Sequence, residues 1–184
     1  MKVEERSAGS PADLAELDRR GDGWRPDQVG TLMFLVEDGQ VLLIRKLRGH
    51  GAGKINGPGG KPEPGESPLQ CVLRETEEEV GIKPREIQHA AVLRFIDTQG
   101  DDWLGYIYVA AGCLGVPRAT AEATPLWYPL ERLPFDEMWE DDRYWLPRIL
   151  NGERLEGEFL FQSGVLRAYR LRSLPASCEA GSLA

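Results

Sequence analysis

The sequence predicts an α/β protein in which a mixed β-sheet lies between helices. Two observations carry this prediction. Apolar, strand-like segments follow one another along the chain, and two helical segments, near residues 68–80 and 139–150, separate them. A chain of 184 residues, 41 % of them hydrophobic, is long enough for one domain with a full core.

A hairpin signal predicts the first strands of this sheet. Apolar runs at 31–36 and 41–44 flank the dipeptide Asp38-Gly39, which favours a tight turn between antiparallel strands. A glycine-rich loop follows over residues 48–65. Period-2 and apolar runs predict the later strands, at 91–96, 103–110 and 125–130, and a final hairpin of 158–162 and 165–171.

The helix expected at 68–80 has recognisable ends. Ser67 is its predicted N-cap, Gln70 completes a capping box, and Gly81 is well placed as the C-terminal stop. The second helix is expected over residues 139–150. Two helices among sequential strands are consistent with a sheet covered on both faces.

The ends of the chain differ in character from its centre. Residues 1–28 are predicted to be an N-terminal extension, partly helical or flexible, with a short helix over 11–20. The domain itself is expected over residues 29–172. Residues 173–184 are small and polar, and we expect a disordered tail there.

Charge and cysteine content exclude several classes of protein. The net charge of −8 argues against a long nucleic acid as partner, because no basic patch dominates. Three distant cysteines without a CxxC spacing indicate neither a disulfide framework nor a zinc site. No apolar run reaches membrane-spanning length, so a cytoplasmic protein, monomeric or homodimeric, is expected.

An acidic cluster on the helix at 68–80 carries the candidate chemistry. Glu75, Glu78 and Glu79 fall on one helical face, where they repel one another unless a cation collects them. Hard cations such as Mg²⁺, or Mn²⁺ in its place, prefer oxygen ligands of this kind. The preceding glycines allow close backbone approach to a metal or phosphate.

These residues resemble the Nudix box of the Nudix hydrolases. The box spacing places a glycine, a glutamate and an Arg-Glu-x-x-Glu-Glu-x-Gly segment in fixed register, and one position departs from it, since Thr76 replaces a hydrophobic residue. The matching positions are Gly60, Glu66, Arg74, Glu75, Glu78, Glu79, Gly81 and Ile82.

The resemblance implies a Nudix α/β/α sandwich that hydrolyses a nucleoside diphosphate linked to another group. It implies that Glu75, Glu78 and Glu79 bind the metal ions, with the carbonyl of Gly60 as a further ligand. Bound Mg²⁺ would neutralise phosphates and activate a water molecule. We expect Glu79 to remove the proton from that water, with Glu122 as the alternative.

Segments outside the box are similar to the oxidised purine nucleoside triphosphatases of this family. The likeness covers residues 49–61, 133–147 and 156–161, within a region of roughly 30–171. It implies hydrolysis of a nucleotide such as 8-oxo-dGTP or 2-hydroxy-dATP to the monophosphate and pyrophosphate, which removes damaged nucleotides from the pool.

The same resemblance implies a base pocket. Its recognition groups would be Asn56, Trp139, Asp141 and Asp142, and adjacent buried carboxyls can exchange protonation states. Asp97 stands where these enzymes carry an aromatic residue, which puts the base preference in doubt. The residues expected to line the pocket are Thr31, Lys46, Phe95, Met138 and Trp145.

Other interpretations stay open at this point. Trp139 and Trp145 could belong to a core helix, and Asp141 and Asp142 could be surface charges in its first turn. The substrate could instead be ADP-ribose, a dinucleoside polyphosphate or an RNA 5′ end. The chain could also be a non-catalytic nucleotide-sensing module on the same scaffold.

Overall fold

A computed structural model describes residues 5–21, 23–49 and 51–175. Their nine-stranded sheet has the order β1-β11-β10-β6-β7-β2-β3-β4, and β9 pairs with β3 along its whole length, Gln40–Lys46. Two pairs, β2 with β7 and β6 with β10, are parallel, so the sheet is mixed as predicted. The strands are β1 (Glu5–Ala8), β2 (Gln28–Glu37), β3 (Gln40–Lys46), β4 (Ile55–Asn56), β6 (Ile87–Asp97), β7 (Trp103–Ala111), β9 (Ala123–Pro129), β10 (Arg154–Gln162) and β11 (Val165–Leu174).

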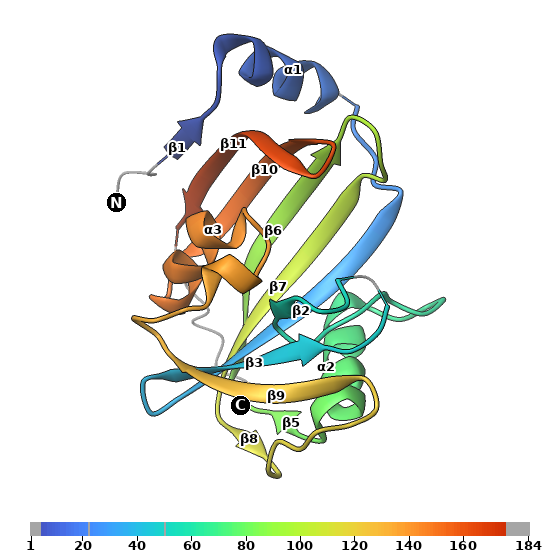
Figure 1. Ribbon diagram of the computed structural model, residues 1–184, viewed down its shortest axis with the longest axis vertical. Coiled ribbons are helices and arrows are strands. Elements are labelled where there is room, and N and C mark those ends of the chain that lie inside the picture. Colours follow the sequence, from blue (N-terminus) through green and yellow to red (C-terminus); the bar gives the residue numbers. More distant parts are fainter. Residues whose placement is uncertain (1–4, 22, 50, 176–184) are drawn as a thin grey trace, which may run out of the picture.

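Helices cover both faces of this sheet (Figure 1). The helix α3 (Asp142–Leu150) packs on one face, against a core that includes Phe34, Leu93 and Phe159. On the other face, α2 (Pro68–Val80) covers Met33 and its neighbours, and α1 (Pro11–Gly21) covers the far end of the strands. The predicted α/β/α sandwich is therefore confirmed.

The turn and cap chemistry read from the sequence is present in the structure. Asp38 and Gly39 both have positive φ, 49° and 74°, as the tight turn between β2 and β3 requires. The Ser67–Gln70 capping box and the left-handed Gly81 bound α2 at the predicted residues. These local signals were sufficient because each element is stabilised within a few residues of its own ends.

Two features differ from the expectation. The second helix begins at Asp142 rather than residue 139, because the Asp142 carboxylate accepts a hydrogen bond from the Trp139 N–H at 3.0 Å and holds residues 139–141 in a turn. A short 3₁₀ helix, Phe135–Glu137, precedes that turn. The small sheet of β5 (Lys83–Pro84) and β8 (Cys113–Leu114) was also not predicted, since two-residue strands carry no periodic pattern.

The N-terminal segment is attached to the domain over much of its length. The predicted helix is present as α1, and its Leu17 is fully buried against the sheet. Strand β1 pairs with β11 at the sheet edge. Because β11 continues to Leu174, the domain ends two residues later than expected, and the rest of the predicted tail, 176–184, lies outside the described residues.

No helix in the described ranges is long and apolar enough to cross a membrane.

The glycine-rich loop runs beside β2 and approaches its backbone closely. The N–H groups of Thr31 and Met33 donate to the carbonyls of Gly60 and Pro58, at 2.9 and 2.8 Å. A Cβ on Gly59 would lie 1.9 Å from the Thr31 carbonyl oxygen, and φ at Gly59 is +155°. A side chain at residue 59 is therefore excluded both by space and by backbone conformation.

We predict that Gly59→Ala lowers the free energy of unfolding by about 2–4 kcal/mol, because the loop must leave β2 to admit the methyl group. Denaturant unfolding at neutral pH measures this difference. Gly30→Ala, in the strand β2 that the loop approaches, is the matched control, since a Cβ on Gly30 would meet nothing closer than 3.6 Å. Equal losses in the two variants would contradict the argument from close approach.

Candidate active site

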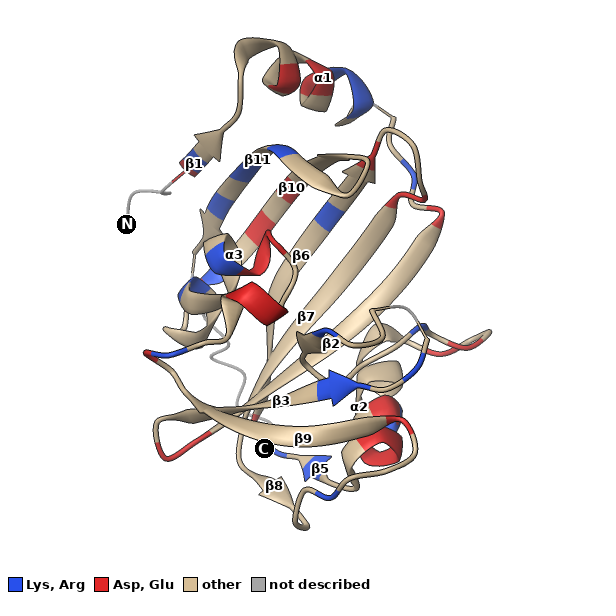
Figure 2. Ribbon diagram, viewed as in Figure 1, with Lys and Arg blue, Asp and Glu red and all other residues tan. Residues whose placement is uncertain are grey.

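Arg74 organises the acidic face of α2. Its guanidinium donates to both carboxylate oxygens of Glu66 at 2.9 Å, to Glu75 at 2.7 Å and to Glu78 at 3.1 Å. The hydrogen bonds from Arg74 lower the pKa of Glu66 to about 2. Arg74 thus holds the neighbouring carboxylates in place, and Figure 2 shows the acidic residues of α2 in red.

Glu79 is turned inward, away from this network. Its side chain is only 2 % exposed and accepts a hydrogen bond from the Gly59 N–H at 2.8 Å. The ammonium group of Lys46 lies 3.4 Å from its other carboxylate oxygen. Burial raises the pKa of Glu79, and Lys46 opposes that shift.

The three glutamates are therefore close in sequence but engaged by different partners. Glu75 and Glu78 face Arg74, whereas Glu79 lies beneath the glycine-rich loop. Across residues 5–21, 23–49 and 51–175, no three Asp, Glu, His or Cys side chains converge into a ready metal cage. Arg74 and Lys46 supply the positive charge that balances these carboxylates.

The glycine-rich loop brings two carbonyls near the carboxylates. The Gly60 carbonyl accepts from the Thr31 N–H at 2.9 Å and from its hydroxyl at 3.2 Å. The Gly59 carbonyl accepts from Lys46 at 3.2 Å, so one ammonium contacts both this oxygen and Glu79. A Cβ on Gly60 would lie 2.4 Å from the Glu75 carboxyl carbon, which explains why the box requires glycine there.

Glu122 lies in the loop before β9, beside the C-terminal end of α2. The hydroxyl of Thr120 donates to the carbonyl of Glu79 at 2.9 Å and accepts from the Glu122 N–H at 3.1 Å. Thr120 thus connects the backbones of the two residues considered as general base. The structure brings Glu122 to this end of the site without placing its side chain in contact with Glu79.

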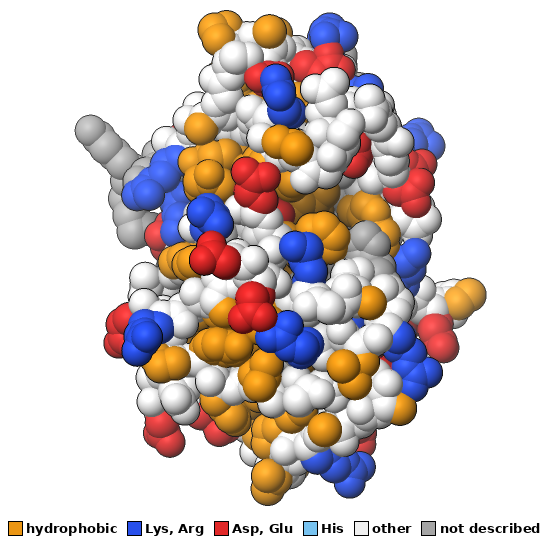
Figure 3. All heavy atoms as spheres, viewed as in Figure 1, with side chains coloured by type: hydrophobic (Ala, Val, Ile, Leu, Met, Phe, Trp, Pro, Cys, Tyr) orange, Lys and Arg blue, Asp and Glu red, His pale blue; other side chains and the backbone are white. Residues whose placement is uncertain are grey.

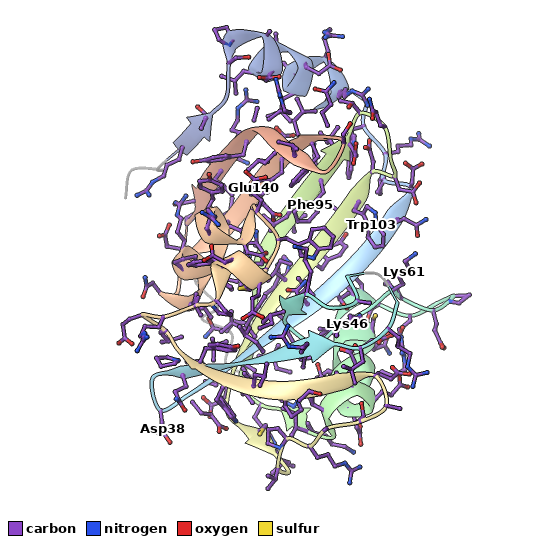
Figure 4. The ribbon with its side chains drawn as sticks, viewed as in Figure 1. Asp38, Lys46, Lys61, Phe95, Trp103 and Glu140 are labelled. Carbon is purple, nitrogen blue, oxygen red and sulfur yellow. The ribbon has the colours of Figure 1, made fainter. Side chains whose placement is uncertain are left out.

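A cavity of about 410 Å³ opens on the sheet face that carries α3. The space-filling view of that face shows apolar side chains exposed between acidic and basic ones (Figure 3). Figure 4 labels four lining residues, Lys46 of β3, Lys61 of the glycine-rich loop, Phe95 of β6 and Trp103 of β7. Gly59 of the loop lines the cavity, and its N–H group bonds Glu79, so the loop lies between the cavity and this carboxylate of α2.

Eight of the nine residues expected to form the base pocket line this cavity. The exception is Met138, which is 2 % exposed and packs in the core with Trp145. Because this side chain packs into the core, its prediction as a lining residue is not supported. The eight are Thr31, Lys46, Asn56, Phe95, Trp139, Asp141, Asp142 and Trp145.

Asp141 and Asp142 are both buried at the cavity rather than exposed in a helical turn. Asp141 accepts a hydrogen bond from the Trp145 indole N–H at 2.8 Å. Burial raises the pKa of Asp141 to about 6, and burial with the charge of Asp141 raises the pKa of Asp142 well above its usual value. The surface-charge interpretation of this pair is therefore wrong for this fold.

Several lining residues were not predicted. Lys54 donates to the Met138 carbonyl at 3.1 Å, and its ammonium lies 5.1 Å from the centre of the Trp139 ring. Gly51 lies against the same indole, since a Cβ there would be 3.5 Å from it. A lysine and a glycine in a loop carry no signal of pocket position, because the fold alone brings them to Trp139. Asp101, Trp103 and Phe161 line the cavity as well, and so does Asp97, which the resemblance had placed at a pocket position.

The fold and the site together define a Nudix hydrolase. Residues 24–149 match the NUDIX domain family, so the chain belongs to it. Nudix hydrolases act on small nucleotide substrates and generally use divalent metal ions.

Named relatives narrow the comparison. The chain is 37 % identical to the oxidized purine nucleoside triphosphate hydrolase of Danio rerio, over 72 % of this chain and 85 % of that protein. The Mus musculus protein of the same name is 33 % identical, over 78 % and 94 %. The crystal structure of a MutT protein from Bacillus halodurans superposes with a TM-score of 0.70 at 29 % identity, covering 78 % of this chain and 97 % of that one.

The raised pKa values of the buried pair predict a pH dependence of stability. Because Asp141 titrates at 3.8 when unfolded and about 6 when folded, its neutral form is favoured by folding, and this contribution is lost as the pH rises through about 6. The free energy of unfolding of Asp141→Asn, relative to that of the wild type, should therefore rise by about 1–3 kcal/mol as the pH is raised from 4 to 7. Denaturant unfolding without nucleotide, across that range, measures the difference.

Asp136→Asn is the control for this experiment, because the Asp136 side chain is fully exposed. Its difference from the wild type should stay nearly constant with pH. A constant difference for Asp141→Asn as well would show that the buried carboxyl does not titrate as described.

Proposed function

We propose that this enzyme hydrolyses oxidised purine nucleoside triphosphates, such as 8-oxo-dGTP or 2-hydroxy-dATP, to the monophosphate and pyrophosphate. The observation that supports this most is the buried Asp141–Asp142 pair beside Trp139, in a cavity next to the Nudix box. The names of the Danio rerio and Mus musculus relatives support the same substrate class. Its role would be to remove damaged purines from the nucleotide pool.

The base pocket supplies complementary donors and acceptors. A purine ring would stack on the Trp139 indole, which Lys54 and Gly51 hold in place. A protonated aspartic acid donates a hydrogen bond while its ionised neighbour accepts one, and the amide of Asn56 offers both. Oxidation changes the donors and acceptors on purine edges, so two adjacent carboxyls can match more than one damaged base.

The cavity volume also bears on the substrate. At about 410 Å³ it lies near the small end of ligand pockets, which favours one nucleoside over a dinucleoside polyphosphate.

The metal site would use the carboxylates of the box. The donor set fits a hard cation, because Glu75, Glu78 and Glu79 offer only oxygen atoms and Lys46 already places a positive charge against Glu79. Mg²⁺ held there would neutralise phosphate charge and lower the pKa of a bound water. We propose the Gly60 carbonyl as a further ligand, and the adjacent Gly59 carbonyl is a second backbone oxygen near Glu79, since Lys46 contacts both.

The other steps follow from residues of the chain itself. We propose Glu79 as the group that accepts a proton from the attacking water, with Glu122 as the alternative. The Gly59 N–H fixes the Glu79 carboxylate, and Arg74 fixes Glu75 and Glu78. Lys46 lies between the cavity and Glu79, where its ammonium can contact a phosphate oxygen.

A nucleotide panel with and without Mg²⁺ tests the reaction. We expect release of monophosphate and pyrophosphate from 8-oxo-dGTP or 2-hydroxy-dATP, and a loss of kcat of roughly 100-fold or more in Glu79→Gln and Glu78→Gln. Glutamine keeps the size of each side chain and, at residue 79, an acceptor for the Gly59 N–H.

Glu77→Gln on the same helix is the matched control, because Glu77 points away and pairs with Lys83 at 3.2 Å. It should retain wild-type kcat. Activity confined to ADP-ribose, dinucleoside polyphosphates or RNA 5′ ends would reject the proposed substrate, and full activity of Glu79→Gln would reject the metal and base assignment.

Trp139→Leu tests base recognition separately from catalysis. Loss of the stacking surface should raise KM roughly 5- to 150-fold with a smaller change in kcat, since stacking of a base on an aromatic ring is worth about 1–3 kcal/mol. Steady-state kinetics on the preferred nucleotide measure both constants. Trp127→Leu, in β9 outside the cavity lining, is the control, and an equal change in KM there would argue against a specific stack.

A further inference from the structure

Trp24 connects the N-terminal segment to the turn between β6 and β7, which lies beside the cavity. This residue follows α1, and its ring packs with Leu17 against the sheet while the Arg94 guanidinium lies 5.4 Å from the ring centre. The ring is thus held by apolar and cation–π contacts that do not involve its N–H group. That group is free to serve a second contact.

The indole N–H of Trp24 donates to a carboxylate oxygen of Asp102 at 2.7 Å. The other oxygen of Asp102 accepts from the N–H of Asp97 at 2.9 Å. Asp97 ends β6 and Asp102 precedes β7, so a single carboxylate closes the turn between the two strands and ties it to the N-terminal segment.

Backbone bonds attach the same turn to the start of β2. The N–H groups of Asp27 and Gln28 donate to the Asp102 carbonyl at 2.9 and 3.0 Å. In return, the Asp102 N–H donates to the Asp27 carboxylate at 2.9 Å. Asp102 is therefore bonded on its carboxylate, its carbonyl and its N–H at once, which leaves the turn little freedom to move.

This turn and the strand ends beside it form part of the cavity wall. Asp97, Asp101 and Trp103 all line the cavity. The amide of Gln28 donates to Asp101 at 3.2 Å and accepts from Lys61 at 2.9 Å, and the Lys61 ammonium lies 4.8 Å from the Trp103 ring centre. A shift of the turn would therefore move two carboxylates and an indole that line the cavity.

We propose that Trp24 is a positioning residue for substrate selection: through Asp102 it fixes the turn that carries Asp97, Asp101 and Trp103, and so sets the shape of the cavity wall. This inference rests on the proposed function in that the cavity receives the purine base. It makes the N-terminal segment part of the specificity apparatus, although Trp24 itself does not line the cavity.

Trp24→Phe separates this role from simple packing. Phenylalanine keeps an aromatic ring for Leu17 and Arg94 but has no N–H for Asp102. We expect KM for the preferred oxidised nucleotide to rise roughly two- to tenfold, the worth of one net hydrogen bond, with kcat within about twofold of wild type. The ratio of kcat/KM among 8-oxo-dGTP, 2-hydroxy-dATP and dGTP should change as well.

Asp102→Asn provides a second route to the same turn. Its amide has only one acceptor oxygen, so either the Trp24 or the Asp97 hydrogen bond must be lost. The double variant should raise KM by less than the product of the two single effects, because both changes act on one chain of contacts. Trp127→Phe is the matched control, and it should leave KM and the nucleotide ratios unchanged.

Calorimetric binding of 8-oxo-dGMP without metal distinguishes failure of this inference from failure of the proposed reaction. A wild type that hydrolyses none of the nucleotides would overturn the proposed function, while weaker 8-oxo-dGMP binding in Trp24→Phe would still support the positioning role. Unchanged KM, nucleotide ratios and binding in both variants, with only a lower Tm, would overturn the inference. Failure of the wild type to bind 8-oxo-dGMP would overturn it too.

Discussion

The close approach of the glycine-rich loop to β2 is the constraint on which the site depends. Backbone atoms of this loop bond to Thr31 and Met33, and no side chain fits at Gly59. The loop then contacts both halves of the site. The Gly59 N–H bonds the Glu79 carboxylate of α2, and other loop residues line the cavity. This contact therefore fixes the carboxylates of α2 relative to the cavity.

Charge within the site is balanced by two cations in different settings. Arg74 is partly exposed and collects Glu66, Glu75 and Glu78, so these carboxylates stay close without a deep burial cost. Lys46 stands against the buried Glu79, where a carboxylate without a partner would be expensive.

The partners of the acidic residues divide them into two kinds. Glu66 and Glu79 of the box each lie against a cation: Arg74 lowers the pKa of Glu66 to about 2, and Lys46 opposes the rise that burial causes in the pKa of Glu79. Asp141 and Asp142 lie in an apolar cavity, where neutral forms are favoured and donor and acceptor roles can be exchanged. One protein thereby holds carboxylates paired with cations and carboxyls kept in an apolar cavity.

The sequence by itself determined the elements with local causes: the Asp38-Gly39 hairpin, both ends of α2, and the box spacing that puts three glutamates on one helix. Tertiary structure decided which way each side chain faces. It turned Glu79 inward and Glu78 outward, buried Met138 in the core, and brought Lys54 and Trp24 to the cavity region. These outcomes depend on contacts between distant segments, and periodicity along a chain carries no information about them.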